Sequence, residues 1–169
     1  DIIIKTDEQI AGIRAASHLA ATILAKLCVM AKEGVTTNEL NEYANELHKE
    51  AGAKPAPLGY GYPPFPKSVC TSINDVICHG IPDDRPLRDG DIVNIDVTSI
   101  LDGYYGDCSR MVMVGTPSKE AKHIVETAYD CLHKSIEILR PGVLLSEVGE
   151  TIHTHAEQEG FSVVEQFVG

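Results

Sequence analysis

Two aspartates, Asp96 and Asp107, lie on either side of an Asp102-Gly103 pair. Asp-Gly is a strong signal for a two-residue turn, and the residues before it are mostly β-formers, so a hairpin is predicted. If this pair forms the turn, Thr98 lies opposite Asp107. Residues two apart along a strand share a face, so both aspartates are expected on one face, as diagonal neighbours with backbones roughly 7–8 Å apart.

Carboxylates that converge in this way need a compensating charge. Without a cation between them, their repulsion raises the pKa of one of the pair. Two divalent metal ions about 3.5–4 Å apart would suit this separation, and such pairs catalyse hydrolysis. Oxygen and imidazole ligands admit Mn, Fe, Co or Zn. The alternative is a solvated hairpin with two surface acids, and geometry alone leaves both interpretations open.

His79 is a second candidate for chemistry. It is followed by Gly80 and lies close to Pro82, so we expect it at a chain reversal from which it can reach a pocket. Histidine is the usual side chain for proton transfer near neutral pH. The same position would also suit an ordinary loop histidine.

A Pro- and Gly-rich stretch, residues 53–66, is expected to lack regular structure. Three aromatic side chains lie in it: Tyr60, Tyr62 and Phe65. A rigid loop with apolar side chains suits the wall of a small pocket. A lid over the core is the other interpretation.

Helices and strands must position these groups. Capping residues and apolar periodicity predict helices from about 7 to 34, 37 to 52, 118 to 139 and 146 to 159. Runs of β-formers predict strands at 68–73, 92–100, 104–114 and 161–167. The helical histidines are expected to be ordinary rather than metal ligands, with the first two at the surface: His18, His48, His153 and His155.

An internal repeat relates the two halves of the chain. The segment GVTTNEL, from Gly34, resembles GVLLSEV, from Gly142, at an offset of 108 residues, and Gly52 and Gly160 share this offset. The first copy covers about residues 6–115, and the second begins at about 118 and runs to 169. The second copy ends in mid-repeat, so we expect a second hairpin, and half of any site between the copies, outside this chain.

Composition sets the remaining bounds. The 169 residues are 43% hydrophobic and 23% charged, which is ordinary for a soluble domain. The net charge of −11 argues against nucleic acid as a direct partner, and no apolar run approaches the ~20 residues of a membrane span. Five cysteines without metal-finger spacing favour reduced thiols in the cytoplasm. The start at Asp1 rather than Met suggests a processed or cut product.

Three segments resemble type I methionine aminopeptidases of the bacterial kind: KSVCTSINDVICHGIPDD (Lys67–Asp84), LRDGDIVNIDVTSILDGYYGDCSRMVMVG (Leu87–Gly115) and EGFSVVEQFVG (Glu159–Gly169). The likeness covers all 169 residues, which would be the N-terminal portion of a single domain. It implies an α+β, pseudo-twofold pita-bread fold whose second half is incomplete, in agreement with the repeat. It also implies a cytoplasmic enzyme with two divalent metal ions. Such enzymes remove the initiator methionine from nascent chains with a small second residue, and ribosome association is a further expectation.

The resemblance also implies individual roles. Asp96 would chelate one metal ion, and Asp107 would bridge both. His79 would contact the substrate and assist proton movement. The pocket for the methionine side chain would be lined by Cys70, Phe65 and either Tyr60 or Tyr62. An apolar, sulfur-tolerant cavity suits an unbranched thioether.

The same resemblance implies that a metal-binding histidine and two glutamate ligands lie beyond Gly169. We therefore expect the 169 residues alone to bind metal weakly and to hydrolyse nothing. Two other functions remain open: a pita-bread peptidase that cleaves X-Pro bonds, and a non-catalytic pita-bread module that binds proteins. The pocket around Cys70 argues against the first, and the retained Asp96, Asp107 and His79 argue against the second.

Overall fold

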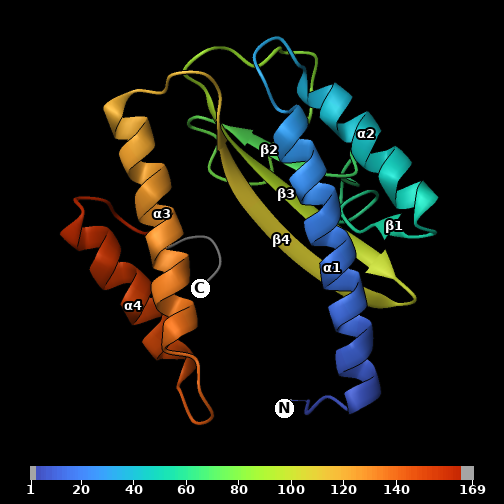
Figure 1. Cartoon of the computed structure of the whole chain (residues 1–169), viewed down its shortest axis with the longest axis vertical. Coiled ribbons are helices and arrows are strands. Elements are labelled where there is room, and N and C mark those ends of the chain that lie inside the picture. Colours follow the sequence, from blue (N-terminus) through green and yellow to red (C-terminus); the bar gives the residue numbers. More distant parts are fainter. Residues whose placement is uncertain (1–2, 165–169) are drawn as a thin grey trace. The chain divides into compact units, whose positions relative to one another are not determined.

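A computed structural model describes residues 3–164 and divides into two compact units, one up to Pro117 and one from Ser118. Within these residues the helices are α1 (Asp7–Met30), α2 (Thr37–Glu50), α3 (Lys119–Glu137) and α4 (Leu145–Gln158) (Figure 1). The strands are β1 (Lys54–Pro55), β2 (Cys70–Ile73), β3 (Ile92–Leu101) and β4 (Tyr104–Met113). All four strands belong to the first unit, whereas the second contains the α3–α4 pair.

β3 is the central strand of an antiparallel sheet. β4 pairs with it along one edge, while β2 and β1 share the other edge. The turn is formed by Asp102 and Gly103, which both have left-handed backbones with φ of +51° and +83°. In the observed register Thr98 pairs with Asp107 and Asp96 pairs with Ser109, which confirms the predicted hairpin.

Alternation along β3 separates the core from the opposite face of the sheet. Val93, Ile95 and Val97 are fully buried and pack with residues of α1 and α2, which cover this face. Gly106 of β4 lies so close to α1 that an added Cβ would be 2.3 Å from the backbone of Ala16. The β3 residues that alternate with Val93, Ile95 and Val97 therefore point away from α1 and α2, toward the other side of the sheet.

His48 is buried, so its prediction as a surface histidine was wrong, whereas His18 is exposed as expected. The His48 Nδ1 lies 2.8 Å from the carbonyl oxygen of Ala44, and the His48 Nε2 lies 2.8 Å from Oγ of Ser99. Residues 44 and 48 are one helical turn apart, which puts His48 on the same apolar face of α2 as Leu40. Its polar atoms are tolerated there because both are paired.

The stretch 53–66 departs from the prediction at its start, because Lys54 and Pro55 form β1 and pair with the end of β3. The rest is an irregular loop, in which the Phe65 amide donates to the Tyr60 carbonyl at 2.8 Å. The following strand begins at Cys70 and is two residues shorter than predicted.

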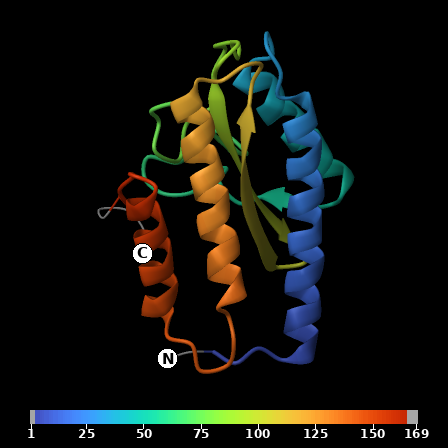
Figure 2. The same ribbon diagram turned by 60° about the vertical axis from the view of Figure 1, so that its left-hand side comes forward.

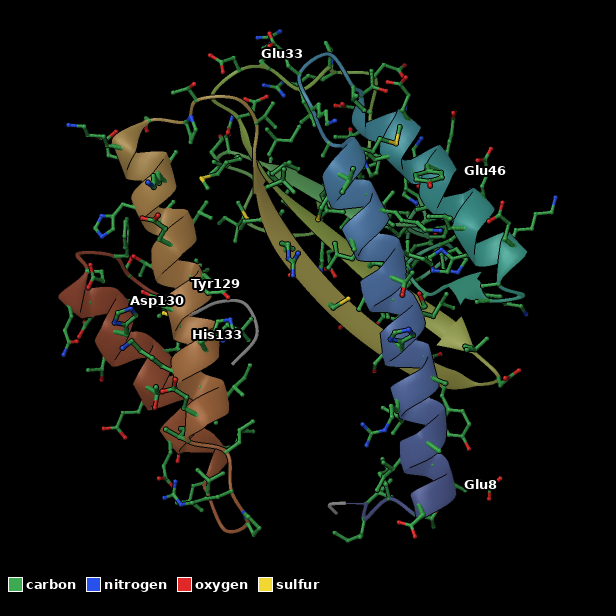
Figure 3. All side chains as sticks on the ribbon, in the orientation of Figure 1. Glu8, Glu33, Glu46, Tyr129, Asp130 and His133 are labelled. Atoms are coloured by element: carbon green, nitrogen blue, oxygen red, sulfur yellow. The ribbon has the colours of Figure 1, made fainter. Side chains whose placement is uncertain are left out.

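The second unit is an antiparallel pair of helices (Figure 2). Both bounds of α4 lie 108 residues after those of α2, as the repeat predicts. On α3, the rings of Tyr129 and His133, both labelled in Figure 3, have centroids 4.2 Å apart and planes tilted by 45°. Residues 161–164 are not in a strand, contrary to the prediction, and the rest of the predicted strand 161–167 lies outside the described residues.

By length and composition alone α1 could cross a membrane, although no apolar run in the sequence predicted a span. A core helix of a globular domain passes the same test. One face of α1, including Ala20, Ile23 and Leu27, is buried in the core of the first unit. We therefore assign α1 to that core.

Candidate metal centre and substrate cavity

The hairpin brings Asp96 and Asp107 to the face of the sheet opposite α1 and α2. Asp96 on β3 is half-buried, and Asp107 on β4 is exposed. Thr98, the cross-strand partner of Asp107, donates a hydrogen bond from Oγ1 to Asp107 Oδ1 at 2.9 Å. The register thus fixes both carboxylates, and Thr98 orients one of them.

The electrostatics of this pair suit a cation. Burial raises the pKa of Asp96, the negative charge of Asp107 raises it further, and His79 acts in the opposite direction. A divalent ion between the carboxylates would remove their repulsion. Residues 3–164 contain no group of three or more His, Cys, Asp or Glu side chains placed to hold a metal. The two carboxylates therefore fit part of a metal site and need further ligands to complete it.

A cavity of about 440 Å³ adjoins the carboxylates. Among the residues that line it are six of the seven predicted from the sequence: Tyr60, Phe65, Cys70, His79, Asp96 and Asp107. They come from the aromatic loop, from β2, from the loop after β2 and from the hairpin. Segments that are distant in the sequence thus contribute to one site.

Tyr62 is the predicted site residue that the structure does not bring to the cavity. Its side chain is fully exposed, whereas Tyr60 lies in the cavity wall. Thr98 and Tyr105 also line the cavity, although the sequence analysis did not propose them. Strand periodicity could have identified both, because each lies two residues from an aspartate of the pair on the same strand face.

Cys70 supplies an apolar part of the wall. It is buried on β2 and pairs with Asp96 in the sheet. Burial, followed by the charge of Asp96, raises the pKa of its thiol to about 11. The side chain therefore stays protonated near neutral pH and behaves as a small hydrophobic group.

His79 reaches the cavity from the loop after β2. The next residue, Gly80, is fixed against β2, because the Thr71 amide donates to the Gly80 carbonyl at 2.8 Å and the Gly80 amide donates to Ser72 Oγ at 3.1 Å. A Cβ on Gly80 would lie 2.2 Å from the Thr71 carbonyl oxygen, so only glycine fits this approach. Gly80 thereby brings His79 to the sheet edge beside Cys70.

The chain resembles known proteins in both sequence and fold. The chain is 59% identical over 169 residues to a methionine aminopeptidase of Chlamydia trachomatis, of which it spans 58%. It superposes with a TM-score of 0.94 and 47% identity on the crystal structure of methionine aminopeptidase from Rickettsia prowazekii, covering 99% of this chain and 66% of that one. The prolidase of Pyrococcus horikoshii, with a TM-score of 0.80 and 23% identity, shares the fold.

The chain thus spans 58% of the length of the Chlamydia trachomatis relative and of two further chlamydial methionine aminopeptidases. The fold is the α+β pita-bread fold, present over part of its length. The profile of metallopeptidase family M24 matches residues 11–169, almost the whole chain including the hairpin and the cavity. The chain therefore belongs to metallopeptidase family M24.

Proposed function

We propose that these residues form the N-terminal part of a methionine aminopeptidase, which removes the initiator methionine from polypeptides with a small second residue. The cavity carries this proposal, because it joins a carboxylate pair, a histidine and an apolar wall. The similarity to methionine aminopeptidases along the whole chain supports it.

Asp96 and Asp107 would hold the two divalent metal ions together with further ligands. When bound, such ions lower the pKa of a water molecule and polarise a carbonyl group. Thr98 would hold the Asp107 carboxylate in place for metal binding through the 2.9 Å hydrogen bond. The remaining ligands would come from further sequence, since the chain spans only 58% of the length of its chlamydial relatives.

His79 would act on the scissile peptide group. Its imidazole lines the same cavity as the carboxylates, so it can donate a hydrogen bond to the carbonyl oxygen or pass a proton to the leaving amine. Both actions require the imidazole to face the reacting atoms rather than the solvent. The position of the loop that carries His79 therefore matters for the rate.

The apolar wall would select the methionine side chain. Cys70 and Phe65 are buried or half-buried, and the more exposed Tyr60 stands at the rim. A flexible, unbranched thioether can fill an irregular apolar cavity. The volume of about 440 Å³ lies within the range of ligand pockets, ~300–1,000 Å³, and leaves room for the following residue.

The finer assignments are part of the same proposal. The metal would be Mn, Fe, Co or Zn, because carboxylate and imidazole ligands suit all four. The substrates would be nascent polypeptides in the cytoplasm, with association with the ribosome as a further possibility to test. The 169 residues alone would bind metal weakly and would not hydrolyse peptides.

The test uses a full-length protein that carries this sequence, with the peptides Met-Ala-Ser and Ala-Pro as alternative substrates. We expect Mn²⁺- or Co²⁺-dependent release of methionine. The Asp96→Asn/Asp107→Asn variant should lose more than about 100-fold of this activity, since both ligands are weakened. Asp102→Asn, at an exposed carboxylate in the hairpin turn and outside the cavity, is the matched control and should keep the activity.

Each alternative has its own result. Cleavage of Ala-Pro without release of methionine would replace the proposal by an X-Pro peptidase. A protein that hydrolyses neither peptide with any of the four metals, and that binds protein partners equally well with and without the two aspartates, would be a non-catalytic module. Calorimetric titration of Mn²⁺ into the 169-residue chain and its double variant shows separately whether the hairpin alone holds a metal.

A further inference from the structure

The loop between β2 and β3 carries His79 but has little regular structure of its own. Asn74 and His79 both have left-handed backbones with φ of +52°. This conformation is unfavourable for most residues other than glycine, and it persists where surrounding contacts fix it. The contacts that hold the loop therefore decide where His79 lies.

Asp91, the residue before β3, joins both ends of this loop. Its buried carboxylate accepts hydrogen bonds from Arg85 Nη1 at 2.8 Å and Nη2 at 3.1 Å, from Asn74 Nδ2 at 2.8 Å and from the Arg88 amide at 2.9 Å. Asn74 directly follows β2, whereas Arg85 and Arg88 precede β3. One carboxylate thus fixes the entry and the exit of the loop relative to each other.

Asn74 completes this arrangement. Its backbone amide donates to the Ile92 carbonyl at 2.9 Å, and its side-chain Oδ1 accepts from the Ile92 amide at 3.0 Å. Asparagine tolerates the left-handed backbone better than most residues, which suits it to this position. We call Asn74, Arg85 and Asp91 the loop clamp.

We propose that the loop clamp positions His79 for catalysis. The clamp residues are not among those that line the cavity, so they act through the loop rather than on the substrate. Gly80, held against β2, fixes the middle of the loop, and the clamp fixes its ends. This inference rests on the proposed function, in which His79 acts on the scissile peptide.

The hairpin itself does not depend on the clamp. β3 and β4 pair through ten consecutive residues, from Ile92 to Leu101, and the core side of β3 is held by α1 and α2. Loss of the clamp should therefore loosen the loop more than the strands. A residue that merely supports the fold would affect both alike, and this difference makes the proposal testable.

The first measurement is amide hydrogen exchange in the 169-residue chain. Asp91→Asn keeps the shape of the side chain but places an amide group against one of its donors. We expect the hydrogen-bonded amides of the loop, those of Asn74, Val76 and Gly80, to exchange at least about tenfold faster, while those of β3 and β4 change little. Asp102→Asn, the same change at an exposed carboxylate in the hairpin turn, is the control and should leave the loop unchanged.

A second variant tests the clamp in case Asp91→Asn does not fold. Asn74→Gly accommodates the left-handed backbone and removes only the bridging side chain, so the fold should be retained. It should produce the same local increase in exchange, to a smaller extent. Equal acceleration across the first unit in both variants, or an unchanged loop, would overturn the proposal.

The second measurement is a double-mutant cycle in the full-length enzyme with Met-Ala-Ser. Asp91→Asn should lower kcat by about tenfold with little change in KM, because the methionine pocket is not on the loop. In a His79→Ala background the same change should lower kcat by less than about twofold, since the group that it positions is gone. Equal effects in both backgrounds would show that Asp91 does not act through His79.

An enzyme that releases no methionine would refute the proposed function. Hydrogen exchange would still decide whether the clamp holds the loop.

Discussion

The two helix pairs share their local signals but differ in what covers their apolar faces. Glu39 accepts a hydrogen bond from the Thr36 amide at 2.7 Å at the start of α2, and Glu147 accepts one from the Leu144 amide at 2.8 Å at the start of α4. In the first pair the apolar face of α1 is buried in the core. Among the equivalent residues of α3, Ile124 and Leu132 are exposed, whereas Cys131 is buried.

Leu24 and Leu132 show this difference directly, because they occupy equivalent positions 108 residues apart. Leu24 is 5% exposed and Leu132 is 54% exposed. Caps and glycines thus suffice to set where each helix begins and ends, whereas burial depends on the sheet that packs against the helix. Helical pattern predicts a helix, but it does not predict how much each apolar residue contributes to stability.

The comparison predicts unequal costs for the same truncation. Leu24→Ala should lower the free energy of unfolding of the first unit by about 2–5 kcal/mol, because it opens a cavity in the core. Leu132→Ala should cost less than about 1 kcal/mol, since half of that side chain is already in water. Urea unfolding followed by circular dichroism measures both, and hydrogen exchange assigns each transition to its unit.

A matched control is Leu132→Ser, which should resemble Leu132→Ala if the side chain is solvated. Equal losses for Leu24→Ala and Leu132→Ala would show that the second helix pair is covered in solution. The claim that the two helix pairs differ in the burial of their apolar residues would then be wrong.

Much of the first unit could be predicted from the sequence because short-range rules determine it. The Asp102-Gly103 turn fixed the register, and the register placed Asp96 and Asp107 on one face. His48 was misassigned because its burial depends on Ser99, a partner 51 residues away.

The loop side chains were harder to predict. Tyr60 and Tyr62 are two apart in a Pro- and Gly-rich loop without periodicity, so no pattern distinguishes the one that lines the cavity from the one that is exposed. The predicted strand 161–167 had the right composition, but a strand also needs a partner strand, and residues 161–164 pair with none in the described part of the chain.

The two units also differ in buried charge. Arg85, followed by Asn74, holds the pKa of Asp91 at about 2. A carboxyl group with a lowered pKa stabilises the folded state above its unfolded pKa near 4, and this contribution is lost as the pH falls toward 2. The first unit should therefore lose about 2 kcal/mol through Asp91 over this range. Urea unfolding at pH 4 and pH 2.5 should show a smaller change for Asp91→Asn than for the wild type.

Exposed ion pairs in the second unit should not give it a comparable loss of stability at low pH. Lys122 and Glu126, for example, are both more than half exposed and 3.6 Å apart. Such pairs contribute little, because water and salt screen them. If the second unit showed the steeper loss of stability between pH 4 and pH 2.5, this difference between the units would not hold.

His48 should make the stability of the first unit depend on pH in a higher range, between pH 5 and pH 7. Burial lowers its pKa, and the hydrogen bond to the Ala44 carbonyl opposes this only in part. The folded state therefore favours the neutral imidazole, and its stability falls as the pH drops below about 6.5, where the unfolded chain takes up the proton. The urea midpoint of the first unit should be lower at pH 5 than at pH 7, and His48→Gln should reduce this difference. The second unit has Ala156 at the equivalent position, so the same pH step should affect it less; an equal shift in both units would point to groups other than His48.

The smallest expected effect concerns the caps, where the two helix pairs can be exchanged. Thr36 caps α2, because its Oγ1 accepts a hydrogen bond from the Glu39 amide at 3.1 Å. Thr36→Ala should therefore lower the stability of the first unit by about 1 kcal/mol.

Leu144 holds the same position before α4 with an extended backbone, but its side chain cannot accept a hydrogen bond and is 65% exposed. Leu144→Thr should therefore stabilise the second unit by up to about 1 kcal/mol, through a new cap and the removal of an exposed apolar group. Thermal unfolding of both variants measures the two changes; a loss of stability in Leu144→Thr would mean that Leu144 makes an apolar contact, and that this end of the second helix pair is covered after all.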